Sequence, residues 1–387
     1  LIVAVDNKKL NGLSLDEVNA LLSGPKGSRV NLELSRKVEQ QGKDVQIPVR
    51  IGLDRKEVIL LDGRVDASFD RIPSGIIAKI GLHAFYQGEN GVTSEEDVIK
   101  AYKNISKNGN IKGLILDLRD NRGGFLMQAV KVAGLFIKSG VVVAAKYSNG
   151  TTQYFRDLDP SVLYNGPIIV LTSRLTASAA EIVALALKDY GVAIIVGDEH
   201  TYGKGSIQTQ TVTDDKQSQD SYFKVTVGTY YTVSGASPQL QGVKADIVVP
   251  SFYAASRIGE EFLPNHIGAS TIAPSFNDAL TDVSRKDKGW YEQYYVPFLQ
   301  KKDTHFRRWI PELNKLSRER LKKNEFYMQL LSGKHDLTID QNGKIQVVHY
   351  STQELEEIIS KLQMEEAENI LKDLITLSGS KPVLPGK

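Results

Sequence analysis

The chain has 387 residues, of which 41% are apolar, enough to fill the hydrophobic cores of two or three domains. Its formal net charge is only +2, so no strong electrostatic field selects nucleic acid or an acidic membrane surface. The sequence has no run of 18 apolar residues and no cysteine, and we therefore expect neither a membrane span, nor a disulfide, nor a cysteine nucleophile.

Residues 1–53 predict one strand, one short helix and two further strands. Helical spacing of apolar residues places the helix over 16–22, and clean alternation places a strand over 30–34. Such a segment is typical of an ordinary small α+β unit and equally of the second half of a PDZ domain. The chain begins at Leu1, inside a strand-like run, so we expect a fragment whose N-terminus, including any signal peptide, is missing.

Residues 54–252 alternate between strand and helix patterns, as α/β domains do. Short apolar runs indicate buried strands, and one long alternating run indicates a strand with a single apolar face. The predicted strands cover 113–119, 141–146, 168–172, 192–196 and 222–233, and the predicted helices cover 126–137 and 179–188. The fold class is therefore α/β (α+β), and this segment is its core.

Residues 253–387 change to a helical and charged pattern. Ser351 and Glu354 have the spacing of a capping box, and apolar residues recur after them at helical spacing. These apolar residues are Leu355, Ile358, Ile359, Leu362, Ile370, Leu371 and Leu374. Segment 301–323 holds nine basic and three acidic residues, which fits a solvated helix face better than a nucleic-acid surface. We therefore expect a helical C-terminal domain and no nucleic-acid partner.

Two residues of the central segment indicate a chemistry. Ser178 stands in the run TASAAE (176–181), after an apolar strand and at the start of a helix of small residues, where backbone N–H groups lack helical partners. Lys204 stands between two glycines in the run TYGKGSIQ (201–208), after a second apolar strand. The pair suggests a serine nucleophile activated by a lysine base. A lysine base must be neutral, which requires an apolar pocket that disfavours the ammonium form.

Neighbouring residues can supply the other groups that acyl transfer needs. The N–H of Ala179 is placed by the helix start, and a second oxyanion donor is expected from Gly123 or Gly124, of which we favour Gly124. Gln208 follows Lys204 by an even separation, so the two side chains share one face if this segment is a strand.

Other interpretations of these residues stay open. A Gly-Gly pair after a strand is often only a turn, Lys204 can be a solvated loop cation, and Asp117 with Arg119 can be a structural ion pair. His200 invites a Ser-His-Asp triad with Asp117 or Asp189, although the polar run around the histidine favours a surface position.

Several stretches, in one order, resemble the C-terminal processing peptidases (tail-specific proteases) of the Prc/Tsp type. The stretches are LSLDEV (13–18) with SGPKGSRV (23–30), LDLRDNRGG (116–124), the Ser178 and Lys204 runs, and VTVGTYYTVSG (225–235) with GVKADIVV (242–249). The resemblance implies a crotonase-like ββα protease core over 54–252. It also implies the C-terminal part of a PDZ domain over 1–53 and a helical C-terminal domain over 253–387.

The resemblance further implies roles for individual residues. Ser178 is the nucleophile, Lys204 is its base, and Gln208 orients the lysine amine. The oxyanion hole is assigned to Gly124 and Ala179, with Gly123 beside them. The positions expected to hold the loops and the helix in register are Arg119, Glu181, Asp189 and Thr201.

The implied function is a serine endopeptidase without a cofactor or metal, which degrades or processes proteins recognised through their apolar C-terminal tails. Its partners are then protein and peptide substrates, it can form a homo-oligomer, and its setting is a bacterial periplasm or cell envelope. Two alternatives are a non-catalytic PDZ-containing binding protein on the same fold and a crotonase-type acyl-CoA enzyme. Cleavage of an unfolded protein by the wild type, but not by Ser178→Ala, distinguishes the protease from both.

Overall fold

The computed structural model divides into two compact units, Leu1–Asp62 and Gly63–Lys387, and each is described by itself. The described residues are 2–25, 27–40, 43–55, 63–88, 91–213, 221–332, 338–339, 345–346 and 350–379. The two units do not test the domain boundaries after residues 53 and 252, which therefore remain predictions from the sequence.

Within its described residues, the N-terminal unit is a four-stranded antiparallel sheet with one helix. The strand order is β2-β1-β3-β4, and the elements are β1 (Ile2–Val5), β2 (Lys8–Lys9), α1 (Leu15–Leu22), β3 (Arg29–Gln40) and β4 (Lys43–Asp54). The predicted helix is confirmed, and it begins at a capping box in which Ser14 and Glu17 exchange hydrogen bonds. Buried Val5, Val30 and Leu32 form the small core of this unit.

A six-stranded sheet forms the centre of the second unit and confirms the α/β fold class. Its order is β14-β11-β10-β7-β6-β5, and β5 alone runs antiparallel to its neighbour in this sheet. The strands are β5 (Val65–Ile72), β6 (Gly75–Leu82), β7 (Ile111–Asp117), β10 (Ile168–Thr172), β11 (Ile194–Gly197) and β14 (Ile247–Val248). Because both faces are covered, the central strands β7, β10 and β11 consist mostly of apolar residues, which is why the sequence predicts them.

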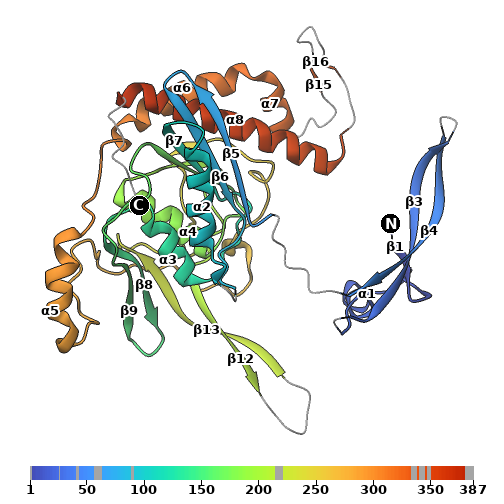
Figure 1. Cartoon of the computed structure of the whole chain (residues 1–387), viewed down its shortest axis with the longest axis horizontal. Coiled ribbons are helices and arrows are strands. Elements are labelled where there is room, and N and C mark those ends of the chain that lie inside the picture. Colours follow the sequence, from blue (N-terminus) through green and yellow to red (C-terminus); the bar gives the residue numbers. More distant parts are fainter. Residues whose placement is uncertain are drawn as a thin grey trace. The chain divides into compact units, whose positions relative to one another are not determined.

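Side chains along each central strand alternate between two hydrophobic cores, one on each face of the sheet. On β10, Ile168 and Val170 join the core of the first face, whereas Ile169 and Leu171 join the core of the second face. The first face is covered by α2 (Ser94–Ser106), α3 (Leu126–Gly134) and α4 (Ala179–Tyr190), and the second by α6 (Ile310–Lys323), α7 (Glu325–Leu331) and α8 (Thr352–Ser378). Figure 1 shows α6, α7 and α8 on one side of β7 and the other three helices on the opposite side.

A second sheet of the same unit has the order β12-β13-β8-β9 and is antiparallel throughout. Its strands are β8 (Gly140–Tyr147), β9 (Thr152–Asp157), β12 (Ser206–Thr213) and β13 (Ser221–Thr232). The strands predicted over 141–146 and 222–233 correspond to β8 and β13. The outer parts of β12 and β13 extend from the body of the unit as a two-stranded ribbon (Figure 1).

The helical C-terminal region packs directly on the central sheet. The predicted capping box is confirmed at the start of α8, where Ser351 and Glu354 exchange hydrogen bonds. The predicted apolar stripe of α8 contributes to the second core, in which Leu371 is fully buried. Gly113 of β7 allows this close approach, because a Cβ atom there would lie 2.8 Å from Leu371 Cδ2.

The remaining elements complete the second unit. They are α5 (Arg285–Tyr294), β15 (Thr338–Ile339), β16 (Ile345–Gln346) and 3-10 turns at Glu260–Phe262, Val296–Phe298 and Arg307–Trp309. Several cations of the basic segment 301–323 form ion pairs; Arg320, for example, binds Glu366 and Asp373. Across the described ranges, the helices are all too short or too polar to cross a membrane.

We predict that Leu371→Ala lowers the free energy of unfolding of the second unit by about 2–5 kcal/mol, because it leaves a cavity between α8 and β7. Urea unfolding followed by tryptophan fluorescence measures the change. Leu263→Ala is the matched control: Leu263 is 45% exposed, and its loss should cost within about 0.5 kcal/mol. Equal unfolding midpoints for the two variants would contradict the hydrophobic core that α8 and β7 share.

Candidate active site

Ser178, Lys204, Gln208 and Gly124 line one cavity of about 710 Å³. Gly124 follows β7 and Ser178 follows β10, so the cavity lies at the carboxyl ends of two neighbouring parallel strands. Its apolar walls come from Phe85, Phe125, Leu126, Ile182 and Ile207. The structure therefore brings together the residues predicted for nucleophile, base, orienting group and oxyanion donor.

Ser178 has a strained backbone at the turn from β10 into α4. Its φ and ψ angles are 58° and −118°, a conformation that non-glycine residues rarely adopt and that costs about 1–3 kcal/mol. Two hydrogen bonds hold the preceding segment against the loop after β7: Ala177 N–H donates to Asn121 O at 3.0 Å, and Thr176 Oγ1 donates to Leu118 O at 2.8 Å. The turn is thereby fixed with Ser178 at the cavity wall.

Glu181, in the first turn of α4, is fully buried and connects the serine segment with the lysine segment. Its Oε2 accepts hydrogen bonds from the backbone N–H groups of Ser178 and Lys204, both at 2.9 Å. Its Oε1 accepts one from Gly203 N–H at 2.7 Å and one from the Thr201 hydroxyl. Burial raises the pKa of Glu181 to about 7, while these hydrogen bonds act in the opposite direction.

The side chain of Lys204 contacts the residue predicted to orient it. Lys204 Nζ donates to Gln208 Oε1 at 3.3 Å. Lys204 itself is half-buried and Gln208 is exposed. Within the described site, no hydrogen bond joins Lys204 Nζ to Ser178 Oγ, a looseness that is common in substrate-free catalytic sites. The catalytic roles of both residues stay a prediction.

Two glycines bring the loop after β7 against the serine. A Cβ atom at Gly124 would lie 2.0 Å from Phe85 O, and one at Gly123 would lie 2.8 Å from Ser178 Cβ, so neither position has room for a side chain. Gly123 N–H donates to Asn121 Oδ1 at 2.9 Å. Among the described residues, the N–H groups of Gly124 and Ala179 have no hydrogen-bond partner. Of the two glycines, only Gly123 uses its N–H within the described structure, and the oxyanion role of Gly124 stays a prediction.

Thr201 and Asp189 support the site from different places. The Thr201 hydroxyl donates to Glu181 and also accepts a hydrogen bond from Val243 N–H at 2.8 Å. Asp189 lies near the far end of α4 and accepts a hydrogen bond from Thr232 Oγ1 at 2.5 Å, which ties that helix to the end of β13. Thr201 therefore acts directly on the Glu181 cluster, whereas Asp189 anchors the helix.

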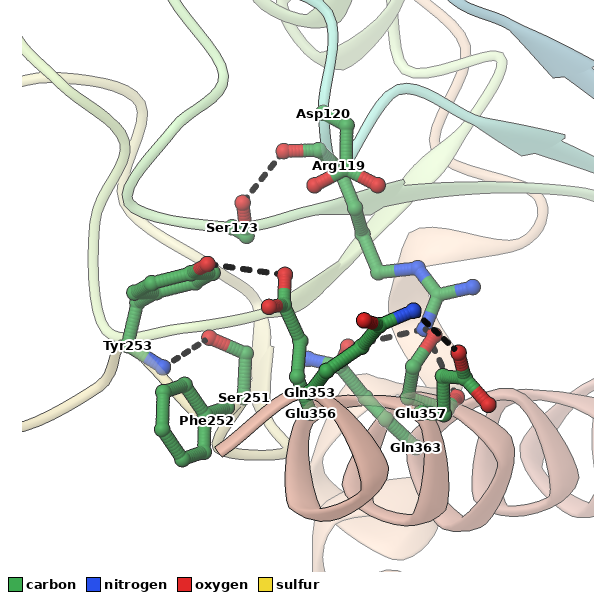
Figure 2. A pocket seen from close by; sticks show the side chains of 11 residues that line it. Arg119, Asp120, Ser173, Ser251, Phe252, Tyr253, Gln353, Glu356, Glu357 and Gln363 are labelled. Carbon is green, nitrogen blue, oxygen red and sulfur yellow. Dashed lines mark hydrogen bonds between the residues drawn. The ribbon is translucent and has the colours of Figure 1, made fainter. Parts of the chain in front are cut away.

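Arg119 points away from the Ser178 cavity, into a separate cavity of about 340 Å³ between the sheet and α8 (Figure 2). Its guanidinium pairs with both carboxylate oxygens of Asp117, so the structural ion pair is present. It also donates to Ser360 O at 2.7 Å and Gln363 Oε1 at 3.2 Å. Only the Arg119 carbonyl reaches the serine segment, where it accepts a hydrogen bond from the Ser173 hydroxyl.

His200 is occupied by groups other than the serine. Its Nε2 lies 2.9 Å from Arg174 Nη1, and its Nδ1 lies 2.8 Å from the carbonyl of Thr201. A Ser-His-Asp triad through His200 is therefore wrong, since neither ring nitrogen is available to Ser178. In the described part of the chain, no three histidine, aspartate or glutamate side chains form a cluster suited to a metal ion.

Two site residues were not predicted from the sequence. Asn121 is buried and donates to Leu82 O at 2.9 Å while it holds Gly123, and its place between a buried strand and a Gly-Gly pair was an available signal. Tyr230 lines the cavity from β13, and no sequence signal pointed to it, because the alternation of that strand places Tyr230 on the same face as Lys224 and Thr226.

Comparison with known proteins places this geometry in a family. The sequence model of peptidase family S41 matches residues 76–249. The chain is 34% identical to the tail-specific protease of Haemophilus influenzae, over 66% of this chain and 36% of the relative. It is 30% identical to the carboxy-terminal processing protease CtpA of Bacillus subtilis, over 64% of this chain and 48% of the relative.

One more curated relative and one solved structure are also similar to this chain. The carboxy-terminal-processing protease of Bartonella bacilliformis is 32% identical, over 74% of this chain and 63% of the relative. The solved photosystem II D1 C-terminal processing protease is 28% identical, with a TM-score of 0.41, over 64% of this chain and 62% of that chain. The chain thus spans between about a third and two thirds of the length of these three curated relatives. Residues 76–249, which contain Ser178, Lys204 and Gln208, therefore belong to peptidase family S41.

Proposed function

We propose that this protein is a serine endopeptidase in which Ser178 and Lys204 form the catalytic dyad. Gln208 orients the lysine amine, and the N–H groups of Gly124 and Ala179 stabilise the oxyanion. The observation that carries the proposal is the shared carboxylate of Glu181, which binds the backbone N–H groups of both dyad residues at 2.9 Å. A strained serine and a lysine joined in this way have no evident use in a binding protein that does no chemistry.

Hydrolysis then follows from groups that line one cavity. Ser178 Oγ attacks the carbonyl carbon of the scissile bond while neutral Lys204 takes its proton. The carbonyl oxygen becomes negatively charged and is met by the two N–H groups that have no other partner in the described structure. Lys204 returns the proton to the departing amine, and a water molecule activated by the same lysine releases the acyl group from Ser178.

The contact between Lys204 and Gln208 corresponds to a resting arrangement in this proposal. The lysine amine must turn from Gln208 Oε1 toward Ser178 Oγ and come within about 2.6–3.2 Å of it. An apolar substrate side chain against Phe125, Leu126 and Ile207 displaces water from the cavity.

For the substrates, we propose proteins and peptides recognised through apolar C-terminal tails. The support is the resemblance to tail-specific and carboxy-terminal processing proteases, as two relatives are named. In this proposal residues 1–53 are the C-terminal part of a PDZ domain, 54–252 are the protease core, and 253–387 are the helical C-terminal domain. The setting is a bacterial periplasm or cell envelope.

We expect Ser178→Ala to lower the rate of cleavage of an unfolded protein by at least about a thousandfold, because the nucleophile is removed. Unfolded casein analysed by gel electrophoresis gives the rate, and a fluorophosphonate probe followed by mass spectrometry identifies the labelled serine. Ser148→Ala, at an exposed turn residue, is the matched control. Wild-type cleavage by Ser178→Ala would refute the dyad, and a wild-type chain without any cleavage would favour the non-catalytic binding protein.

Tail recognition predicts a dependence on the end of the substrate. Two unfolded substrates that differ only in their last residues, apolar in one and acidic in the other, should differ in kcat/KM by about tenfold in favour of the apolar tail. Amidation of the apolar tail should remove the advantage, since a carboxylate is part of such recognition. Equal kcat/KM values for all three substrates would show that this chain does not recognise the C-terminal tail of its substrates.

Glu181→Gln should slow catalysis and should remove the part of the pH dependence of stability that is due to Glu181. An amide nitrogen cannot accept hydrogen bonds, so two of the four donors lose their acceptor, and we expect kcat to fall on the order of 10- to 100-fold. In the folded protein Glu181 keeps its proton up to about pH 7, against an ordinary pKa of 4.5. Between these values the folded state binds more protons than the unfolded state, so this contribution to stability is lost as the pH rises through 7.

Urea unfolding at pH 5, 6, 7 and 8 tests whether the stabilising contribution of Glu181 decreases as the pH rises. The stability of the wild type relative to Glu181→Gln should decrease over this series, while Glu199→Gln, at an exposed position, should keep a constant difference. A relative stability that stays constant with pH would mean that the carboxylate is ionised in both states over this range, contrary to the effect of its burial.

A further inference from the structure

Tyr230 of β13 contacts the main chain of both proposed dyad residues. Its hydroxyl lies 3.0 Å from Ser178 O and forms a second, shorter contact with Lys204 O. Its own backbone N–H donates to Gly205 O at 2.9 Å, so the residue is attached to the lysine segment twice. The side chain is 3% exposed and lines the active-site cavity.

The two contacts complete a clamp around the site. Glu181 accepts hydrogen bonds from the N–H groups of Ser178 and Lys204, and Tyr230 binds the carbonyl groups of the same two residues. A phenol carries one proton, so the hydroxyl donates to one carbonyl oxygen at a time and must lie between the two. The distance between the serine and lysine backbones is thereby limited by one rigid side chain.

We propose that Tyr230 is a positioning residue for hydrolysis, which sets the separation of Ser178 and Lys204 through their carbonyl groups. This inference rests on the proposed dyad. It assigns a role in the reaction to a residue whose side chain need not touch the substrate.

The surroundings of Tyr230 suit such a role. β13 is an inner strand, paired with β12 on one side and with β8 on the other, and Tyr230 lies opposite Ala145 of β8. The ring packs in the core of the first sheet face, so the hydroxyl has little freedom to move. Burial raises the pKa of Tyr230 well above its ordinary value, and the carboxylates of Glu181 and Glu260 add to the effect, so the hydroxyl remains a donor at physiological pH.

Loss of the hydroxyl should act mainly on the chemical step. Without it, two buried carbonyl groups lose a partner, and the segment around Lys204 can shift relative to Ser178. A misplacement of about 1 Å between reacting groups can cost on the order of a hundredfold in rate. Substrate binding along the apolar walls of the cavity should change much less, because those walls stay in place.

Tyr230→Phe tests the proposal, and Tyr231→Phe is a matched control. Tyr231 is the next residue, is also buried, and its hydroxyl contacts Ser270 Oγ at 2.7 Å. We measure kcat and KM on a peptide substrate and count competent sites by titration with a fluorophosphonate. We expect kcat per titrated site to fall on the order of 10- to 100-fold in Tyr230→Phe, with KM within about twofold of the wild type. Tyr231→Phe should keep the wild-type kcat.

The titration separates positioning from a loss of folded protein. If Tyr230→Phe reduces only the number of titrated sites while kcat per site stays at the wild-type value, the proposal is overturned. A fall in kcat of the same size in both variants overturns it as well, because the effect would then be general. Ser178→Ala, measured in parallel, distinguishes failure of the proposed dyad from failure of the positioning role. If Ser178→Ala keeps wild-type activity, the proposed dyad is wrong. If it is inactive while Tyr230→Phe is normal, only the positioning role fails.

Discussion

One buried carboxylate connects the chain segments that the site requires. Glu181 lies in the first turn of α4, and its two oxygens accept hydrogen bonds from both the serine and the lysine segments. Burial disfavours the charged form and raises the pKa of Glu181 to about 7, while the four donors that converge on the carboxylate act in the opposite direction. The positions of Ser178 and Lys204 relative to each other therefore depend on a residue that need not contact the substrate.

Close backbone approach is the second constraint on the site. Ser178 keeps its strained conformation because its neighbours are fixed to the loop after β7, and that loop can lie so close only because Gly123 and Gly124 have no side chains. Asn121 contributes to both sides, since its side chain holds Gly123 and its carbonyl holds Ala177. The strained conformation of Ser178 thus depends on the close approach of the loop after β7.

The sequence predicted most of what depends on local pattern. β10 was predicted over its full length, 168–172, because a strand covered on both faces is uniformly apolar, and the start of α8 was predicted from a capping box that acts within one turn. The surface that α8 covers could not be predicted, since helical periodicity indicates an apolar face without its partner. Tyr230 could not be predicted either: the alternation of β13 places it on the same face as Lys224 and Thr226, and the carbonyl groups that it contacts come from two distant segments.

The C-terminal helices take part in this arrangement, although they lie outside the segment matched by the family. Gln363 of α8 accepts a hydrogen bond from Arg119 and donates one to Val249 O at 2.7 Å. Arg119 begins the loop that leads to Gly124, and its carbonyl accepts a hydrogen bond from the Ser173 hydroxyl, ahead of Ser178. One helix therefore contacts both Arg119, at the start of the loop that leads to Gly124, and the end of the matched segment. In a sheet with two covered faces, the second layer of helices thus also helps to hold the loops at the strand ends.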